Sequence, residues 1–228
     1  DLAALEAALG RSCASDGWTL VGGGLYIIGA DTLVGDDDIG SLTALVNITG
    51  KGSGGHSLHI TNNDKLESLD GLARLRGALS GGLNIRYNPK LVSLDGLAGL
   101  TGIDAEGGTS TSAGGAQSSF SVHIYDNAAL RSIAGLRGAL RGRTLPARLV
   151  IGGNDVLASA AGLEGLAGAT SEVHIAYNGE HQGGMCVSAD DYTALSEITV
   201  ISTSGVPAVP GESSNFPGAN CVACARDA

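Results

Sequence analysis

The chain is poor in aromatic and basic residues, and it has no long apolar run. Phe, Trp and Tyr make up 4% of its 228 residues, and 13 Lys and Arg stand against 23 Asp and Glu, which gives a net charge of −10. A nucleic-acid-binding surface needs clustered Lys and Arg, so this balance argues against nucleic acid as a partner. A bilayer-spanning helix needs about 20 apolar residues in succession. The sequence holds no such stretch, and we expect no membrane span in this chain.

Cysteine is scarce as well, with Cys13, Cys186, Cys221 and Cys224 placed towards the two ends. These are too few for a small disulfide-dense scaffold. Cys221 and Cys224 have the spacing of half a zinc knuckle, but a second such pair and a nearby histidine are missing, so we predict no metal and no cofactor. Disulfide chemistry in an oxidising compartment fits better. The glycosylation triplet that begins at Asn47 also favours an extracellular protein.

Glycine and small aliphatic residues are abundant, and they occur in a repeated pattern. The chain has 37 Gly, which suit tight corners because glycine adopts a positive φ without steric cost. Five segments follow the pattern h-x-h-x-x-N, where h is apolar, and four of them continue with an apolar residue or Ala at every third position. The first apolar residue and the asparagine of each segment are Leu58 and Asn63, Leu83 and Asn88, Val122 and Asn127, Leu149 and Asn154, and Val173 and Asn178.

One such unit cannot bury its apolar face alone, so neighbouring units must cover it. The sequence therefore predicts an all-β protein with few short helices, namely a right-handed parallel β-helix or leucine-rich-repeat-like solenoid of about six coils with capped ends. We expect an N-terminal cap over residues 1–24, with a helix near its start, then coils over residues 25–184. A C-terminal cap and the start of a Cys-rich segment follow over residues 185–228. The asparagines are expected to stack at one turn and bond its unpaired backbone groups.

The segments between the motifs carry further predictions. A second apolar patch after several Leu triplets predicts a second strand or turn in each coil, which would give two or three sheet faces in place of the strand and helix of an ordinary leucine-rich repeat. Residues 106–119 are rich in Gly, Ser and Thr and are expected to form a mobile loop. Residues 36–38 are all Asp; calcium is a possible ligand, but a solvated acidic loop is favoured. A strand is predicted over residues 198–201.

Two lines of sequence, LHITNNDKLESLDGLARLRGAL and LNIRYNPKLVSLDGLAGLTGI, resemble the receptor L domain. This leucine-rich-repeat-like β-helix module occurs in insulin-receptor and epidermal-growth-factor-receptor ectodomains, and related modules occur in fungal wall and protist surface proteins. The resemblance implies a disulfide between Cys186 and Cys221, and it implies that Cys224 begins a following Cys-rich module. The pairing of Cys13 stays open. Since the chain begins at Asp1, we expect a processed or excised piece of a longer protein.

Side chains alternate along a strand, so the middle residue of each motif points away from the core. His59, His123 and His174 share this outward column, which we expect to be a solvent-facing polar stripe. They stand two strands apart in turn, about 10 Å, too far to share a zinc ion. The neighbouring outward positions predict a binding patch, because Tyr and Arg favour interfaces. Its members are Arg86, Tyr87, Tyr125, Asp126 and Tyr177.

No paired carboxylates, nucleophile with a base, or phosphate-cradling loop stands out, so we expect no enzyme. The favoured function is a non-catalytic structural or recognition module of a secreted or cell-surface glycoprotein. Its expected partners are other protein subunits of an extracellular assembly, such as a filament, or a surface glycan used for adhesion. Two alternatives stay open: a carbohydrate-active β-helix enzyme acting through Asp126, and a ligand-binding fragment of a receptor ectodomain.

Overall fold

The computed structural model describes residues 17–29, 35–40, 42–52, 54–104, 109–111, 117–157, 159–169, 173–176, 178–179 and 199–200. Within these ranges the protein consists mostly of strands in parallel sheets, with few short helices. The predicted all-β class is therefore confirmed. The predicted helix near the N-terminus, all four cysteines and Tyr177 lie outside the described residues.

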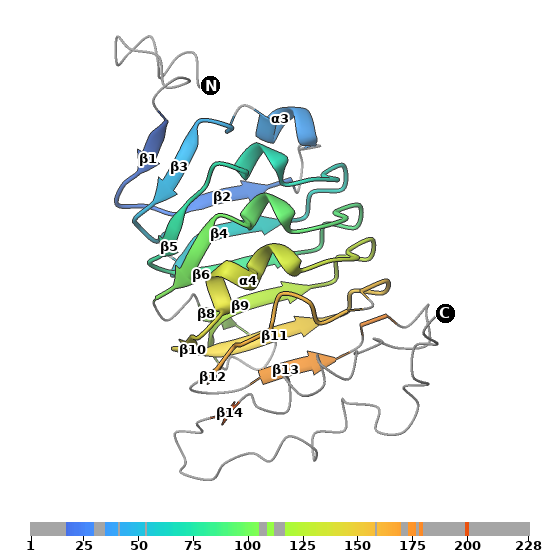
Figure 1. Ribbon diagram of the computed structural model, residues 1–228. Helices are drawn as coiled ribbons and strands as arrows, with labels where there is room; N and C mark the ends of the chain where they lie inside the picture. Colours follow the sequence, from blue (N-terminus) through green and yellow to red (C-terminus); the bar gives the residue numbers. More distant parts are fainter. Residues whose placement is uncertain are drawn as a thin grey trace, which may run out of the picture.

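The largest sheet holds the repeated motifs side by side in sequence order (Figure 1). Its parallel strands are β2 (Leu25–Ile28), β4 (His56–Thr61), β6 (Gly82–Arg86), β9 (Gln117–Tyr125), β11 (Arg148–Gly152) and β13 (Val173–Ala176). Their first apolar residues pair across the sheet, from Leu25 with Leu58 through to Leu149 with Val173. The register is therefore the one that the repeat predicts, and a slip of one residue would turn every apolar side chain outward.

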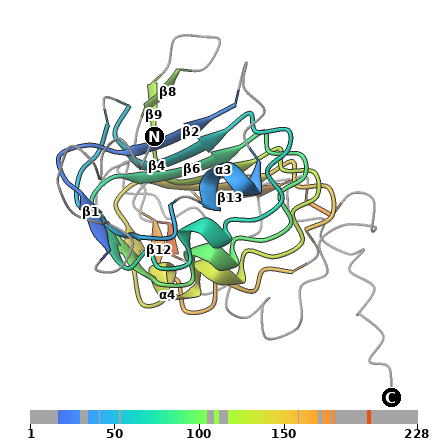
Figure 2. The same ribbon diagram turned by 90° about the horizontal axis from the view of Figure 1, so that it is seen from above.

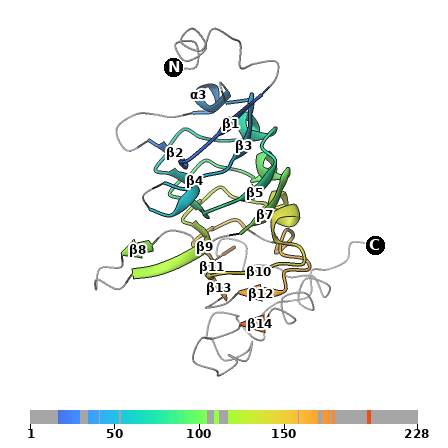
Figure 3. The same ribbon diagram turned by 90° about the vertical axis from the view of Figure 1, so that its left-hand side faces the viewer.

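A second series of short parallel strands follows the leucine triplets, as predicted. It consists of three separate groups (Figure 3): β1 (Trp18–Leu20) with β3 (Leu45–Ile48), β5 (Gly77–Leu79) with β7 (Leu100–Ile103), and β10 (Thr144–Leu145) with β12 (Gly168–Ala169) and β14 (Thr199–Val200). Strand β14 falls within the predicted strand at residues 198–201. Leu, Ile and Val side chains from both series and from the triplets form one buried cluster.

Short helices connect the two series, which the repeat did not predict. They are α3 (Asp36–Gly40), the 3-10 helices η1 (Asp70–Leu72), η2 (Asp95–Leu97) and η3 (Ala134–Leu136), and α4 (Arg137–Leu140). Seen from above, α4 lies on the opposite side of the molecule from strands β2, β4 and β6 (Figure 2). Each 3-10 helix precedes a strand of the second series, so the predicted second strand or turn is present after these triplets, and the 3-10 conformation is the part that was not predicted.

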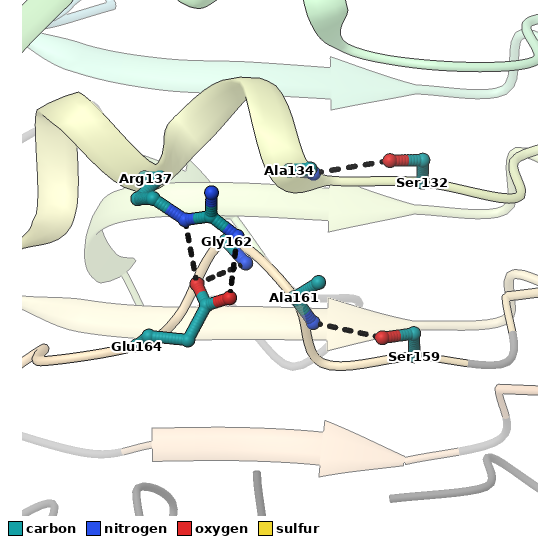
Figure 4. A network of polar contacts seen from close by, with 7 residues as sticks. All are labelled: Ser132, Ala134, Arg137, Ser159, Ala161, Gly162 and Glu164. Atoms are coloured by element: carbon teal, nitrogen blue, oxygen red, sulfur yellow. Dashed lines mark hydrogen bonds and ion pairs between the residues drawn. The ribbon is translucent and has the colours of Figure 1, made fainter. Parts of the chain in front are cut away.

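A serine and a glycine recur at the 3-10 turns. Ser132 Oγ accepts a hydrogen bond from the Ala134 N–H at 3.2 Å, and Ser159 does the same for Ala161 at 3.0 Å (Figure 4). At the glycine, three residues after the serine, the backbone of one turn touches the turn before it. A Cβ added to Gly96 would lie 2.0 Å from the Leu69 carbonyl oxygen. Only glycine allows this close approach, so the Ser-x-x-Gly-Leu segment sets the spacing of the turns.

Two predicted loops contain regular structure. Residues 36–38, expected as a solvated acidic loop, begin α3, and Asp36 Oδ1 accepts the N–H groups of Glu67 at 2.8 Å and Ser68 at 3.0 Å. Asp36 therefore joins two successive repeats. The predicted mobile loop at 106–119 contains β8 (Thr109–Thr111), which pairs antiparallel with the first residues of β9. This arm projects from the edge of the stack in Figure 3.

Candidate functional site

The five motif asparagines form one column at the end of the large sheet, as the repeat predicts. Each side-chain oxygen from Asn88 to Asn178 accepts a hydrogen bond from the Nδ2 of the preceding asparagine, at 2.8 to 3.2 Å. The same oxygens accept the preceding asparagine's backbone N–H. Four of the asparagines are fully buried and Asn178 is nearly so. The column therefore satisfies groups that the turn would otherwise leave unpaired in the core.

The residue before each of the first four asparagines has a left-handed backbone, which the motif did not reveal. Asn62, Tyr87 and Asp126 have φ of 58°, 55° and 54°, and Gly153 has 65°. Non-glycine residues adopt this conformation at a cost, least for Asn and Asp. Tyr87 is the unusual member. Tyr87 is 43% exposed, and its ring lies against Arg86, whose guanidinium carbon is 5.5 Å from the ring centroid.

The outward histidine column is not the solvent-facing stripe that alternation predicted. The middle residues of the first four motifs are buried or half-buried, with Asn84 at 2% and His123 at 8% exposure; they are His59, Asn84, His123 and Val150. Neighbouring rings cover the two histidines. Tyr26 stacks on His59 with centroids 5.1 Å apart, and Phe120 stacks on His123 at 4.4 Å. Period-two alternation gives the direction of a side chain, whereas its burial depends on the size of its neighbours.

Burial keeps the histidines of this face neutral. Desolvation lowers the pKa of His123 to about 3, with a smaller contribution from the positive charge of Arg86. His56, whose ring packs edge-on against His59, has its pKa lowered to about 4, mainly by burial and then by His59. The pKa of His59 is lowered for the same main reason. At neutral pH the positive charge on this face therefore comes from arginine.

A shallow cavity of about 330 Å³ opens on the outward face, over strands β6, β9 and β11. Its lining consists of Arg86, Tyr87, Phe120, His123, Tyr125, Arg148 and Val150. Arg86 pairs with Tyr125 across the sheet, and the next residue in that row is Gly152, which has no side chain. The Arg148 guanidinium carbon lies 5.0 Å from the centroid of the Phe120 ring. The cavity therefore combines two cations with three aromatic side chains and a neutral histidine.

The structure brings part of the predicted patch together. Arg86, Tyr87 and Tyr125 line the cavity, whereas Asp126 does not and Tyr177 is outside the described residues. Burial raises the pKa of Asp126, Asp155 raises it further, and Arg86 lowers it. Sequence reasoning missed Phe120 and Arg148. They pair with each other beside register shifts that precede the apolar motif, so the repeat does not mark them.

Other candidate chemistry is sparse. The described part of the chain contains no group of three His, Cys, Asp or Glu side chains that could hold a metal ion. None of its helices is long and apolar enough to cross a membrane. Asn47, the predicted glycosylation site, lies half-buried on β3 and pairs with Thr19 of β1. Comparison with protein families, curated proteins and solved structures finds no match to the chain.

Proposed function

We propose that the chain is a non-catalytic recognition or structural module of a larger secreted or cell-surface glycoprotein, mediating assembly or adhesion through its sheet faces. In this proposal the parallel strands belong to a right-handed β-helix solenoid of the leucine-rich-repeat-like kind, and its partners are other subunits of an extracellular assembly or a surface glycan. The in-register sheet and the asparagine column support the solenoid, because both need each repeat to lie directly on the last.

The single observation that carries the binding role is the cationic, aromatic cavity on the outward face. Arg86 and Arg148 line it in a protein whose net charge is −10, and no carboxylate lines it. Tyr and Arg are the residues that most often anchor a partner. Most of the side chains that line the cavity stand on neighbouring strands of one parallel sheet, whose hydrogen-bonded backbone fixes their spacing.

The extracellular location rests on sequence features. The glycosylation triplet at Asn47, the end cysteines and the resemblance to the receptor L domain all favour it. That resemblance also suggests the Cys186–Cys221 disulfide, and mass mapping of the oxidised protein tests this pairing directly.

Binding without turnover is the test of the proposed function. The chain is presented to a panel of surface glycans and to the subunits found with it in its native assembly. We expect saturable binding that falls on Tyr125→Ala, with every glycan recovered intact. Cleavage of any bound glycan contradicts the non-catalytic role, and binding that is insensitive to Tyr125→Ala removes the cavity from it.

A carbohydrate-active enzyme is the second candidate, favoured by the raised pKa of Asp126 close to Arg86. Acid–base cleavage of a sugar ordinarily needs two carboxyl groups. Asp155 is the nearby carboxylate that raises the pKa of Asp126. Cleavage of an acidic polysaccharide that Asp126→Asn abolishes, with binding retained, would establish this function.

A further inference from the structure

The cavity is built to receive a negative charge. Its two arginines face it from different strands, Arg86 from β6 and Arg148 from β11, with β9 between them. His123 is neutral at physiological pH and adds no charge of its own. The two guanidinium groups, each lying against an aromatic ring, favour a planar anion, because a guanidinium binds a carboxylate through two parallel hydrogen bonds.

Arg86 is poised for such a partner. Among the described residues no carboxylate lies within ion-pair distance of its guanidinium, although Arg137 and Arg143 pair with Glu164 and Asp104. The Arg86 Nε is buried and has no hydrogen-bond acceptor in the described part of the chain. A buried charged donor without an acceptor is costly to keep, so a bound anion would relieve that cost.

The rest of the lining suits one flat ring. Tyr87, Phe120, His123 and Tyr125 present aromatic surfaces, and Val150 adds an aliphatic one. A volume of about 330 Å³ is at the small end for a ligand site. It gives room for a single ring-sized group, whose apolar face can lie against the aromatic side chains while its charge reaches an arginine.

A protein partner fits less well. Such interfaces need a broad apolar centre of several hundred Å². The large apolar side chains exposed in the described residues are Val21, Tyr26, Ile28, Tyr87 and Val92, and of these only Tyr87 lines the cavity. Tyr26 and Ile28 lie on β2, which β4 separates from β6. The cavity is therefore a compact site rather than the centre of an apolar patch.

We propose that this cavity binds a carboxylate-bearing sugar residue of an acidic glycan, with Arg86 holding the carboxylate and the aromatic side chains supporting the sugar ring. The inference rests on the proposed recognition function and names its ligand. Arg148 is the second cation and directs the charged end of the sugar. Neutral sugars lack the group that the arginines recognise.

Calorimetric titration tests this with two probes of equal length, a tetrasaccharide of galacturonic acid and its carboxyl-reduced counterpart. We expect the acid to bind and the reduced form to bind at least about tenfold more weakly, because charged hydrogen bonds are lost. Arg86→Gln should weaken binding of the acid by a similar factor. The affinity of Arg86→Lys for the acid should lie between those of the wild type and Arg86→Gln, since lysine keeps the charge but cannot make two parallel hydrogen bonds to the carboxylate. Arg74→Gln, at an exposed arginine outside the cavity, is the matched control and should bind normally.

Further measurements separate a misfolded variant from a true loss of binding. Unchanged circular dichroism of Arg86→Gln shows that it folds, and Arg148→Gln provides a second, independent loss. The inference is overturned by no binding of the acid up to about 1 mM, by equal binding of the two probes, or by equal competition from a glutamate peptide of the same charge. If the acidic sugar does not bind but Tyr125→Ala still abolishes binding of another partner, the proposed recognition function stands and only the ligand assignment is wrong. Cleavage of the tetrasaccharide instead removes the non-catalytic role and leaves the ligand assignment in place.

Discussion

Replacing an asparagine of the column by alanine should cost more in its middle than at its start. Asn127 accepts hydrogen bonds from the Asn88 N–H and Nδ2 and donates to the oxygens of Ile85, Tyr125 and Asn154. Asn63 donates to the Ile27 carbonyl and to Asn88 Oδ1, and its own oxygen has no donor among the described residues. Both side chains are fully buried. The two substitutions therefore remove the same atoms and differ only in the bonds that these atoms make.

The difference can be estimated group by group. In Asn127→Ala the buried Asn88 N–H loses its acceptor outright, which costs roughly 1–3 kcal/mol. The bonds to Ile85 and Asn154 are lost as well, at about 1 kcal/mol each, whereas the Tyr125 carbonyl still accepts the Tyr87 N–H. Asn63→Ala loses two bonds and leaves no backbone N–H unpaired. We expect about 3–5 kcal/mol for Asn127→Ala and about 1–2 kcal/mol for Asn63→Ala.

Urea unfolding at neutral pH measures both values. Far-UV circular dichroism follows the whole chain, and the fluorescence of Trp18 follows its N-terminal end. Coincident transitions are needed before free energies are compared, because stacked repeats can unfold in parts. Equal losses for the two variants, or a larger loss for Asn63→Ala, would refute the view that the column is stabilised by its bonds along the stack.

Three further predictions concern packing, protonation and surface charge. Gly96→Ala should destabilise the protein by about 3 kcal/mol, because the new Cβ would lie 2.0 Å from the Leu69 carbonyl oxygen. Gly23→Ala is the control and should not destabilise it, because a Cβ at Gly23 would have nothing within 4 Å. Equal melting temperatures of the two variants would contradict the close approach at Gly96. Folded His56 and His123 have pKa values of about 4 and about 3 against 6.5 when unfolded, so the unfolded chain takes up protons first as pH falls. The free energy of unfolding should therefore be constant above pH 7 and fall below pH 6.5 by about 1.4 kcal/mol per pH unit for each histidine. His123→Phe keeps a ring beside Phe120 and should reduce this pH dependence, as measured by urea titrations at pH 5 and 7. An unchanged slope would show that His123 is charged when folded. The Arg137–Glu164 pair (2.7 Å) is partly exposed, so Glu164→Gln should cost less than about 1 kcal/mol and less still in high salt. A loss of several kcal/mol would contradict the small contribution expected of an exposed ion pair.

The repeat predicted the large sheet well because two independent periodicities agree there. Apolar residues at alternate positions set which side chains face the core, and the asparagine that follows fixes where each strand ends. The 3-10 turns were missed for a physical reason. Leucine at every third position is compatible with either an extended corner or a 3-10 helix, which has three residues per turn. The serine and glycine within the same triplets distinguish the two, since Ser132 bonds the first N–H of η3 and Gly135 touches the turn before it.

The candidate site was only partly predictable. Alternation correctly placed Arg86 and Tyr125 on the outward face and in register with each other. It gave no indication that Phe120 would cover His123, because the register shift beside Phe120 depends on the geometry of the strand entry. The alternation of apolar and polar residues can be recognised from the sequence, whereas a β-bulge depends on the loops between the repeats, which the repeat pattern does not describe.

The asparagine column and the cavity are physically joined. The Asn88 Nδ2 donates to the Arg86 carbonyl at 3.0 Å, and the Asn127 Nδ2 donates to the Tyr125 carbonyl at 3.3 Å. Between each pair lies a left-handed residue, Tyr87 or Asp126, whose strain persists only where the surroundings impose it. The buried amides thus bond the backbone of two residues that line the cavity, Arg86 and Tyr125, on the strand side of each left-handed residue. The asparagine column therefore also fixes the backbone beside the part of the cavity that lies at the carboxyl ends of β6 and β9.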